Sequence, residues 1–91
     1  MLQQQLTVDE VAARSKALYE TSIRSQVETE ENIGKMVVIE PLSGDFAVDA
    51  KGIESSFYLQ DRHPGARLFG IRIGYNVAAS LGGVMERTAT Q

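Results

Sequence analysis

The chain has 91 residues, of which 43% are hydrophobic, and its formal net charge is −3. This length and apolar share predict one globular domain with a single modest core. The chain has no cysteine, which excludes disulfide bonds, thiolate metal sites and a cysteine nucleophile. Its negative charge argues against a general affinity for nucleic acid or for anionic membranes.

No apolar run approaches the roughly 18 residues that a membrane-spanning helix needs, and residues 1–5 lack the charged and apolar regions of a signal peptide. We therefore expect a cytoplasmic protein. Residues 1–6 predict a disordered lead. Residues 7–91 predict a single domain, which consists of a helix over 7–31, a core motif over 34–83 and a polar tail over 84–91.

The first helix is predicted from its start signal and its periodicity. Thr7 and Glu10 match a capping box, in which each side chain bonds the other residue's backbone amide. Apolar residues then recur at helical spacing and face a core: Val8, Ala12, Tyr19, Ile23 and Val27. Charged residues occupy the other side, where Arg14, Lys16 and Arg24 alternate with acidic residues. This pattern is typical of a solvated face.

Residues 34–50 predict a β-hairpin. The apolar run 36–39 suits a strand, and Pro41 followed by Ser43, Gly44 and Asp45 suits a turn. After the turn, residues 46–49 alternate between apolar and small or charged side chains, which is typical of a second strand.

A second helix is expected over 53–62, ended by His63 and Pro64. In this helix we expect Ile53 and Phe57 to face the core, together with Leu59 or Gln60, and Glu54, Ser55 and Asp61 to face solvent.

Residues 67–75 predict a third strand with one apolar face. That face carries Phe69, Ile71, Ile73 and Tyr75, and the opposite face carries Leu68, Gly70, Arg72 and Gly74. Beyond it, Asn76 could cap a short helical turn over 77–81, and Val84-Met85 could add a fourth strand.

The element order α-β-β-α-β predicts a two-layer α+β domain. The simplest sheet has the first strand in the centre, flanked by the second and third. Both helices would then cover the face that carries Phe69, Ile71 and Ile73.

No catalytic, cofactor-binding or metal-binding residue is predicted. His63 has no cysteine or second histidine to join it as a metal ligand. The glycines match no phosphate-binding spacing. Glu40, Asp45 and Asp49 lie on the hairpin, where Asp45 is most simply a turn residue.

The remaining candidates are residues for binding a partner. Three arginines, Arg67, Arg72 and Arg87, follow the second helix, and Gly70 and Gly74 leave a sheet face open to close approach by another chain. The alternative is that the arginines are surface charges paired with Glu40 or Asp49.

One resemblance follows from these motifs. Gly34-Lys35 before an apolar strand, the turn Ser43-Gly44-Asp45, the helix end Arg62-His63-Pro64 and the strand at 69–75 resemble a group of small uncharacterised bacterial proteins. The resemblance covers about residues 34–83 and implies a fold without an established activity. By analogy, it suggests an antitoxin-like or accessory partner protein.

The sequence thus favours a non-enzymatic protein-interaction module without a cofactor. A domain this small buries a low fraction of its surface, so we expect a homodimer or a protein partner and no membrane. The alternative is a nucleic-acid-binding antitoxin or regulator that uses Arg14, Lys16 and Arg24 on the first helix. An enzyme is a third, less favoured reading.

Overall fold

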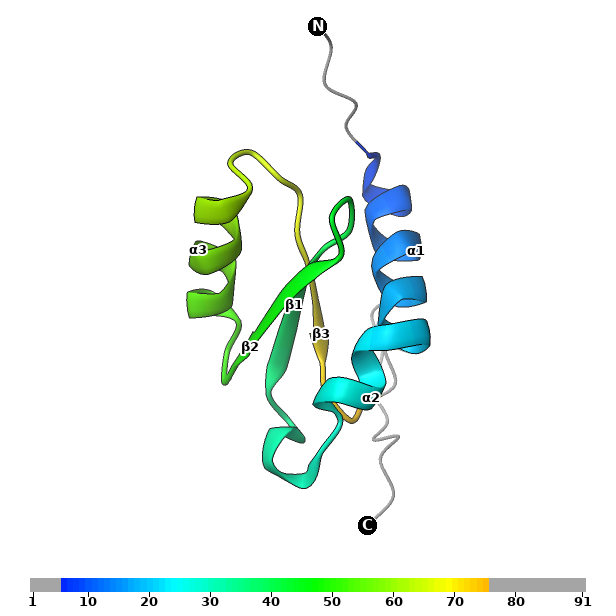
Figure 1. The fold of residues 1–91 in the computed structure, drawn as a ribbon, viewed down its shortest axis with the longest axis vertical. Coiled ribbons are helices and arrows are strands. Elements are labelled where there is room, and N and C mark those ends of the chain that lie inside the picture. The colour runs from blue at the N-terminus through cyan, green and yellow to red at the C-terminus, as the bar shows by residue number, and fades with distance from the viewer. Residues whose placement is uncertain (1–5, 76–91) are drawn as a thin grey trace, which may run out of the picture.

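The computed structural model describes residues 6–75. Helical structure runs from residue 8 to residue 27 as α1 (Val8–Leu18), a π-helical turn (Tyr19–Ile23) and α2 (Arg24–Val27), and a 3₁₀ turn follows at Glu30–Asn32. The rest comprises β1 (Met36–Glu40), β2 (Asp45–Asp49), α3 (Ile53–Arg62) and β3 (Phe69–Arg72). Figure 1 shows the three strands between α1 on one side and α3 on the other.

The start of α1 confirms the predicted capping box. The Thr7 amide donates to Glu10 Oε1 at 2.8 Å, and the Glu10 amide donates to Thr7 Oγ1 at 3.1 Å. Both bonds satisfy amides that would otherwise lack a partner at the first turn of the helix.

The strands form one antiparallel sheet in the order β2-β1-β3. The α+β class, the hairpin, the central position of the first strand and the bounds of the second helix are therefore confirmed. The third strand is shorter than predicted, since it covers Phe69–Arg72.

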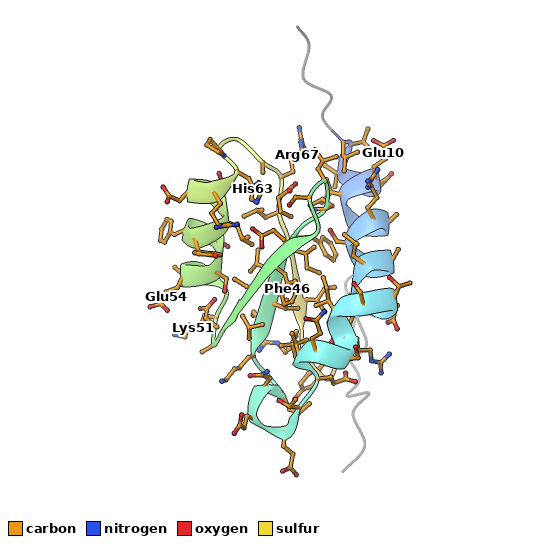
Figure 2. The ribbon with its side chains drawn as sticks, viewed as in Figure 1. Glu10, Phe46, Lys51, Glu54, His63 and Arg67 are labelled. Carbon is orange, nitrogen blue, oxygen red and sulfur yellow. The ribbon has the colours of Figure 1, made fainter. Side chains whose placement is uncertain are left out.

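The main core lies on one face of this sheet. Val37, Ile39 and Ile71 point from the strands toward the first helical segment, and residues 19, 23 and 27 of that segment pack onto them. Phe46, Val48 and Phe69 lie at the margin of this cluster, where they are half-buried. Figure 2 shows Phe46 between the hairpin and the first helical segment.

The second helix covers the other face, which corrects the expectation that both helices share one. Gly52, at the start of α3, lies against Met36 and Val38, whose side chains point away from the main core. The helices α1 and α3 therefore lie on opposite sides of the sheet (Figure 1). The reason lies in β1, where apolar residues occupy consecutive positions, so that both faces of the strand need cover.

The orientation of α3 also differs from the prediction. Ile53 and Phe57 are 57% and 71% exposed, whereas Ser55 and Leu59 are buried at 3% and 0%. The Asp49 carboxylate explains this orientation, because it accepts hydrogen bonds from the amides of Gly52 and Ser55 and from the Ser55 hydroxyl. These bonds turn Ser55 inward, and Leu59, one turn later, follows on the same face.

The sheet face covered by α3 stays partly open. The helix lies mainly over β2 and β1. Gly70 and Arg72 of β3, which point to this face, are exposed. Within residues 6–75, no helix combines the length and the apolar character that crossing a membrane requires. The turn expected after Asn76, the strand expected at Val84-Met85, the tail over 84–91 and Arg87 lie outside the described residues.

Candidate functional site

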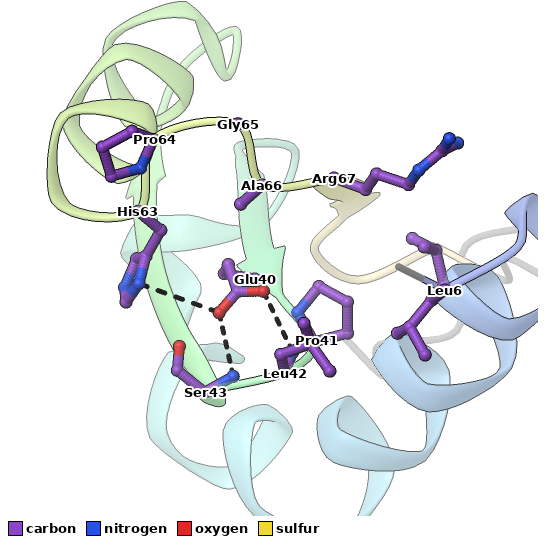
Figure 3. Close-up of a pocket in the computed structure, with 11 residues that line it drawn as sticks. Leu6, Glu40, Pro41, Leu42, Ser43, His63, Pro64, Gly65, Ala66 and Arg67 are labelled. Atoms are coloured by element: carbon purple, nitrogen blue, oxygen red, sulfur yellow. Dashed lines mark hydrogen bonds and ion pairs between the residues drawn. The ribbon is translucent and has the colours of Figure 1, made fainter. Parts of the chain in front are cut away.

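A pocket with a cavity volume of about 330 Å³ opens between the β1–β2 turn, the loop 63–67 and the start of α1. Figure 3 shows Glu40 at its centre, with the turn residues 41–43 beside it and His63 facing it from the end of α3. Most of the lining is apolar and comes from residues far apart in the sequence: Leu6, Val11, Pro41, Leu42, Pro64 and Ala66.

Glu40 is the buried polar group of this pocket. Its side chain is 4% exposed, and its two oxygens accept the amides of Ser43 at 2.8 Å and Leu42 at 3.0 Å. Burial alone would raise the pKa of Glu40, but the hydrogen bonds from Ser43 and Leu42 and the proximity of His63 outweigh it and hold the pKa below its ordinary value. Glu40 is therefore ionised at neutral pH.

His63 connects Glu40 to a second carboxylate. Its Nε2 lies 3.0 Å from Asp45 Oδ2, and its Nδ1 lies 3.9 Å from Glu40 Oε1. Arg62 Nε lies 2.9 Å from the same Asp45 oxygen. The hydrogen bonds from His63 and then Arg62 lower the pKa of Asp45. This carboxylate thus fixes the C-terminal end of α3 to the start of β2.

The contact with Asp45 assigns the donor on the imidazole. An ionised carboxylate only accepts hydrogen bonds, so His63 Nε2 carries the proton in this contact. In the neutral ring, Nδ1 is then an acceptor. While the ring is neutral, the floor of the pocket presents two acceptors, His63 Nδ1 and Glu40 Oε1, which are 3.9 Å apart.

Within residues 6–75, the groups around the pocket form neither a serine–histidine pair nor a metal site. Ser43 Oγ accepts the Asp45 amide at 3.1 Å, and within residues 6–75 no hydrogen bond joins it to His63. A serine nucleophile needs such a bond to its base. In the same part of the chain, no group of three or more histidine, cysteine, aspartate or glutamate residues is placed to hold a metal ion.

A second feature is the outward face of α3, which we define as Ile53, Phe57 and Tyr58. Their exposed fractions are 57%, 71% and 50%. The Arg62 guanidinium carbon lies 5.4 Å from the centre of the Tyr58 ring, a cation–π contact on the same helix. Glu54 points to solvent beside these residues (Figure 2).

The residues predicted to bind a partner are not gathered in one place. Arg72 Nη1 donates to the Gly34 carbonyl at 2.6 Å, and Arg67 lines the pocket before β3 begins. Beside Arg72, Gly70 faces the Met36 methyl group, which would be 3.0 Å from an added Cβ. Gly74 is buried in the turn after β3, and Arg87 lies outside the described residues.

The sequence reasoning missed the cluster of Glu40, His63 and Asp45. In the sequence, 23 positions separate Glu40 from His63, so no local pattern connects the two residues. One available signal was the position of Glu40, directly after an apolar strand and before Pro41. A carboxylate there can accept the free amides of the following turn. The helical spacing of Ile53 and Phe57 predicts a core face, whereas the structure exposes both side chains.

These observations define the class of the protein as a small α+β domain with a polar-floored pocket and an apolar outer helix face. Comparison with protein-family models, with curated proteins and with solved structures finds no match for this chain. The resemblance to small bacterial proteins therefore stays a prediction.

Proposed function

We propose that this domain acts by binding protein rather than by catalysis, and that the outward face of α3 joins two copies of the chain. The main observation in support is that Ile53, Phe57 and Tyr58 expose half or more of their surface on one short helix. Aromatic side chains are the commonest anchors of protein interfaces, because each one buries a large area at a low cost in conformational entropy.

The charges around this face suit a second copy. Lys51, Glu54, Asp61 and Arg62 supply two charges of each sign on or beside α3. Two such surfaces do not repel each other as a whole, whereas a partner of strongly basic or acidic surface would gain little from them.

The size of the outward face of α3 limits the expected affinity of the dimer. A ten-residue helix is about 15 Å long, so pairing through α3 buries less than the roughly 800 Å² per partner of a standard interface. We therefore expect a weak dimer with a dissociation constant in the micromolar range or above. A cytoplasmic location and an accessory or antitoxin-like role belong to the same proposal.

Sedimentation over a range of protein concentrations tests the proposal. The wild type should shift from monomer toward dimer as concentration rises, and Phe57→Ala should weaken this association about tenfold or more. Leu42→Ala is the matched control, because Leu42 is 56% exposed but belongs to the β1–β2 turn. A wild-type protein that stays monomeric near 10.0 kDa up to millimolar concentration would overturn self-association through this face.

The alternative, nucleic-acid binding through the first helical segment, has less support. Arg24 lies 3.0 Å from Glu20 and 2.8 Å from Glu28, so two acidic neighbours already occupy its guanidinium. Phosphate contacts need basic groups that are available to the backbone of the nucleic acid. Salt-dependent binding to duplex DNA by the wild type would favour this alternative over the first proposal.

A further inference from the structure

We propose that the pocket at Glu40 and His63 binds a primary ammonium group carried on an apolar chain. This inference is independent of the proposed dimer, because the pocket and the outward face of α3 share no residue. It is based on the charge of the pocket floor, the spacing of two acceptors and the apolar walls.

The floor carries a negative charge held in a fixed position. The turn amides of Leu42 and Ser43 orient the two Glu40 oxygens, and each oxygen keeps a second lone pair. Within residues 6–75, the basic side chain recorded beside Glu40 is that of His63, at 3.9 Å, and the two form an ion pair only when the imidazole is protonated. A charge-assisted hydrogen bond from a ligand would therefore meet a preorganised acceptor.

The spacing of the acceptors suits a nitrogen with several donors. A separation of 3.9 Å between Glu40 Oε1 and His63 Nδ1 is too long for a direct hydrogen bond. While His63 is neutral, a donor atom displaced to one side of the line that joins them can lie about 2.9 Å from both. A primary ammonium has three N–H groups, so it can donate to both acceptors, whereas a hydroxyl donates only once.

The walls suit an apolar chain behind that ammonium. They are formed mainly by Leu6, Val11, Pro41, Leu42 and Ala66. The volume of about 330 Å³ is roughly twice that of an apolar cavity known to hold benzene. A chain of about four to six carbons fits this space. Arg67 lines the pocket, but its side chain extends away from Glu40 (Figure 3), so its charge does not oppose an ammonium directly.

Two sources can supply this chemistry, a free alkylamine and the lysine side chain of a peptide. Hexylamine and Nα-acetyl-lysine methylamide represent them. Each would be titrated into the ¹⁵N-labelled wild-type chain, with the amides of residues 40, 42–43, 63 and 65–67 as reporters. Ligands this small are expected to bind in the millimolar range, so the titration should reach about 10 mM.

Hexanol and hexanoate are the matched controls, with the same chain but another head group. We expect hexylamine, the lysine derivative or both to bind at least about tenfold more tightly than either control, because only the ammonium donates to both acceptors. The tighter of the two amines identifies the source. Equal affinity for hexanol, or no shift of the reporter amides with either amine, would overturn the proposal.

Two variants locate the binding. Glu40→Gln keeps the size of the side chain and removes its charge, so it should abolish the preference for amine over alcohol. Ala66→Leu adds a larger side chain to the pocket wall and keeps the Glu40 carboxylate, so it should weaken the binding of every ligand about tenfold or more. If Glu40→Gln does not fold, Ala66→Leu and the wild-type preference decide the question. Phe57→Ala is the folded control outside the pocket, and loss of amine binding in this variant would contradict the proposed location.

Discussion

The carboxylate of Asp49 accepts hydrogen bonds from both the amide and the hydroxyl of Ser55, six residues further along the chain. Asp49 is the last residue of β2, and Ser55 lies in the first turn of α3. The hydrogen bonds from Ser55 are also the largest cause of the lowered pKa of Asp49. One side chain thus ends the hairpin, caps the helix and sets which face of the helix is buried.

Ser55→Ala tests this relationship. The variant loses a hydrogen bond to a charged acceptor, worth about 1.5–3 kcal/mol, and regains about 0.5 kcal/mol of helix propensity. We therefore expect the free energy of unfolding to fall by about 1–2.5 kcal/mol in urea titrations. Ser25→Ala, on the exposed surface of α2, should change it by less than about 0.5 kcal/mol. Equal effects at the two serines would contradict the role of Ser55.

Leu59 and Phe57 provide a comparison within one helix. Leu59 is 0% exposed and Phe57 is 71% exposed. Leu59→Ala should lower the free energy of unfolding by about 2–5 kcal/mol, because it leaves a cavity between α3 and the sheet. Phe57→Ala should change it by about 0.5 kcal/mol or less. Thermal unfolding followed by circular dichroism, at a concentration where the chain is monomeric, measures both. A larger loss of stability in Phe57→Ala than in Leu59→Ala would support the orientation of α3 expected from the sequence.

Gly52 should be intolerant of a side chain for two reasons. Its φ of +86° strains any L-residue by about 1–2 kcal/mol, and a Cβ would lie 3.3 Å from Met36 Cβ and 3.4 Å from Val38 Cγ2. Gly65 has a φ of +78° but nothing within 4 Å of an added Cβ. Gly52→Ala should therefore destabilise the fold by about 1 kcal/mol or more beyond Gly65→Ala in urea unfolding. Equal losses would show that contact with the sheet adds nothing.

Acid should remove the stabilisation that Asp45 provides. The hydrogen bonds from His63 and Arg62 hold its pKa in the folded chain below its ordinary value. The folded state therefore binds the proton less readily than the unfolded state. The stabilisation is complete above about pH 4 and is lost as the pH falls further, through the lower folded-state pKa.

Urea unfolding of the wild type and Asp45→Asn at successive pH values measures this effect. The wild type should be more stable than the variant above about pH 4, and the difference should shrink as the pH falls below that value. Asp61→Asn is the control, since Asp61 is exposed and has no ion pair within residues 6–75. A difference between wild type and Asp45→Asn that stays constant down to about pH 2 would contradict the assignment.

The sequence by itself determined the local structure of this protein. The capping box of Thr7 and Glu10, the hairpin turn after Pro41 and the limits of α3 all depend on residues a few positions apart. Such signals act through steric limits on the backbone and through short-range hydrogen bonds, so they can be recognised without knowing the rest of the fold.

Only the tertiary structure decided which surfaces meet. Ile53 and Phe57 have the spacing of a core face, and so do Ser55 and Leu59. The hydrogen bond from Ser55 to Asp49 decides that the second pair is buried. The pocket likewise requires β1 and the end of α3 to bring Glu40 and His63 together. Contacts between residues this far apart depend on the packing of whole elements, which the pattern of a single segment does not contain.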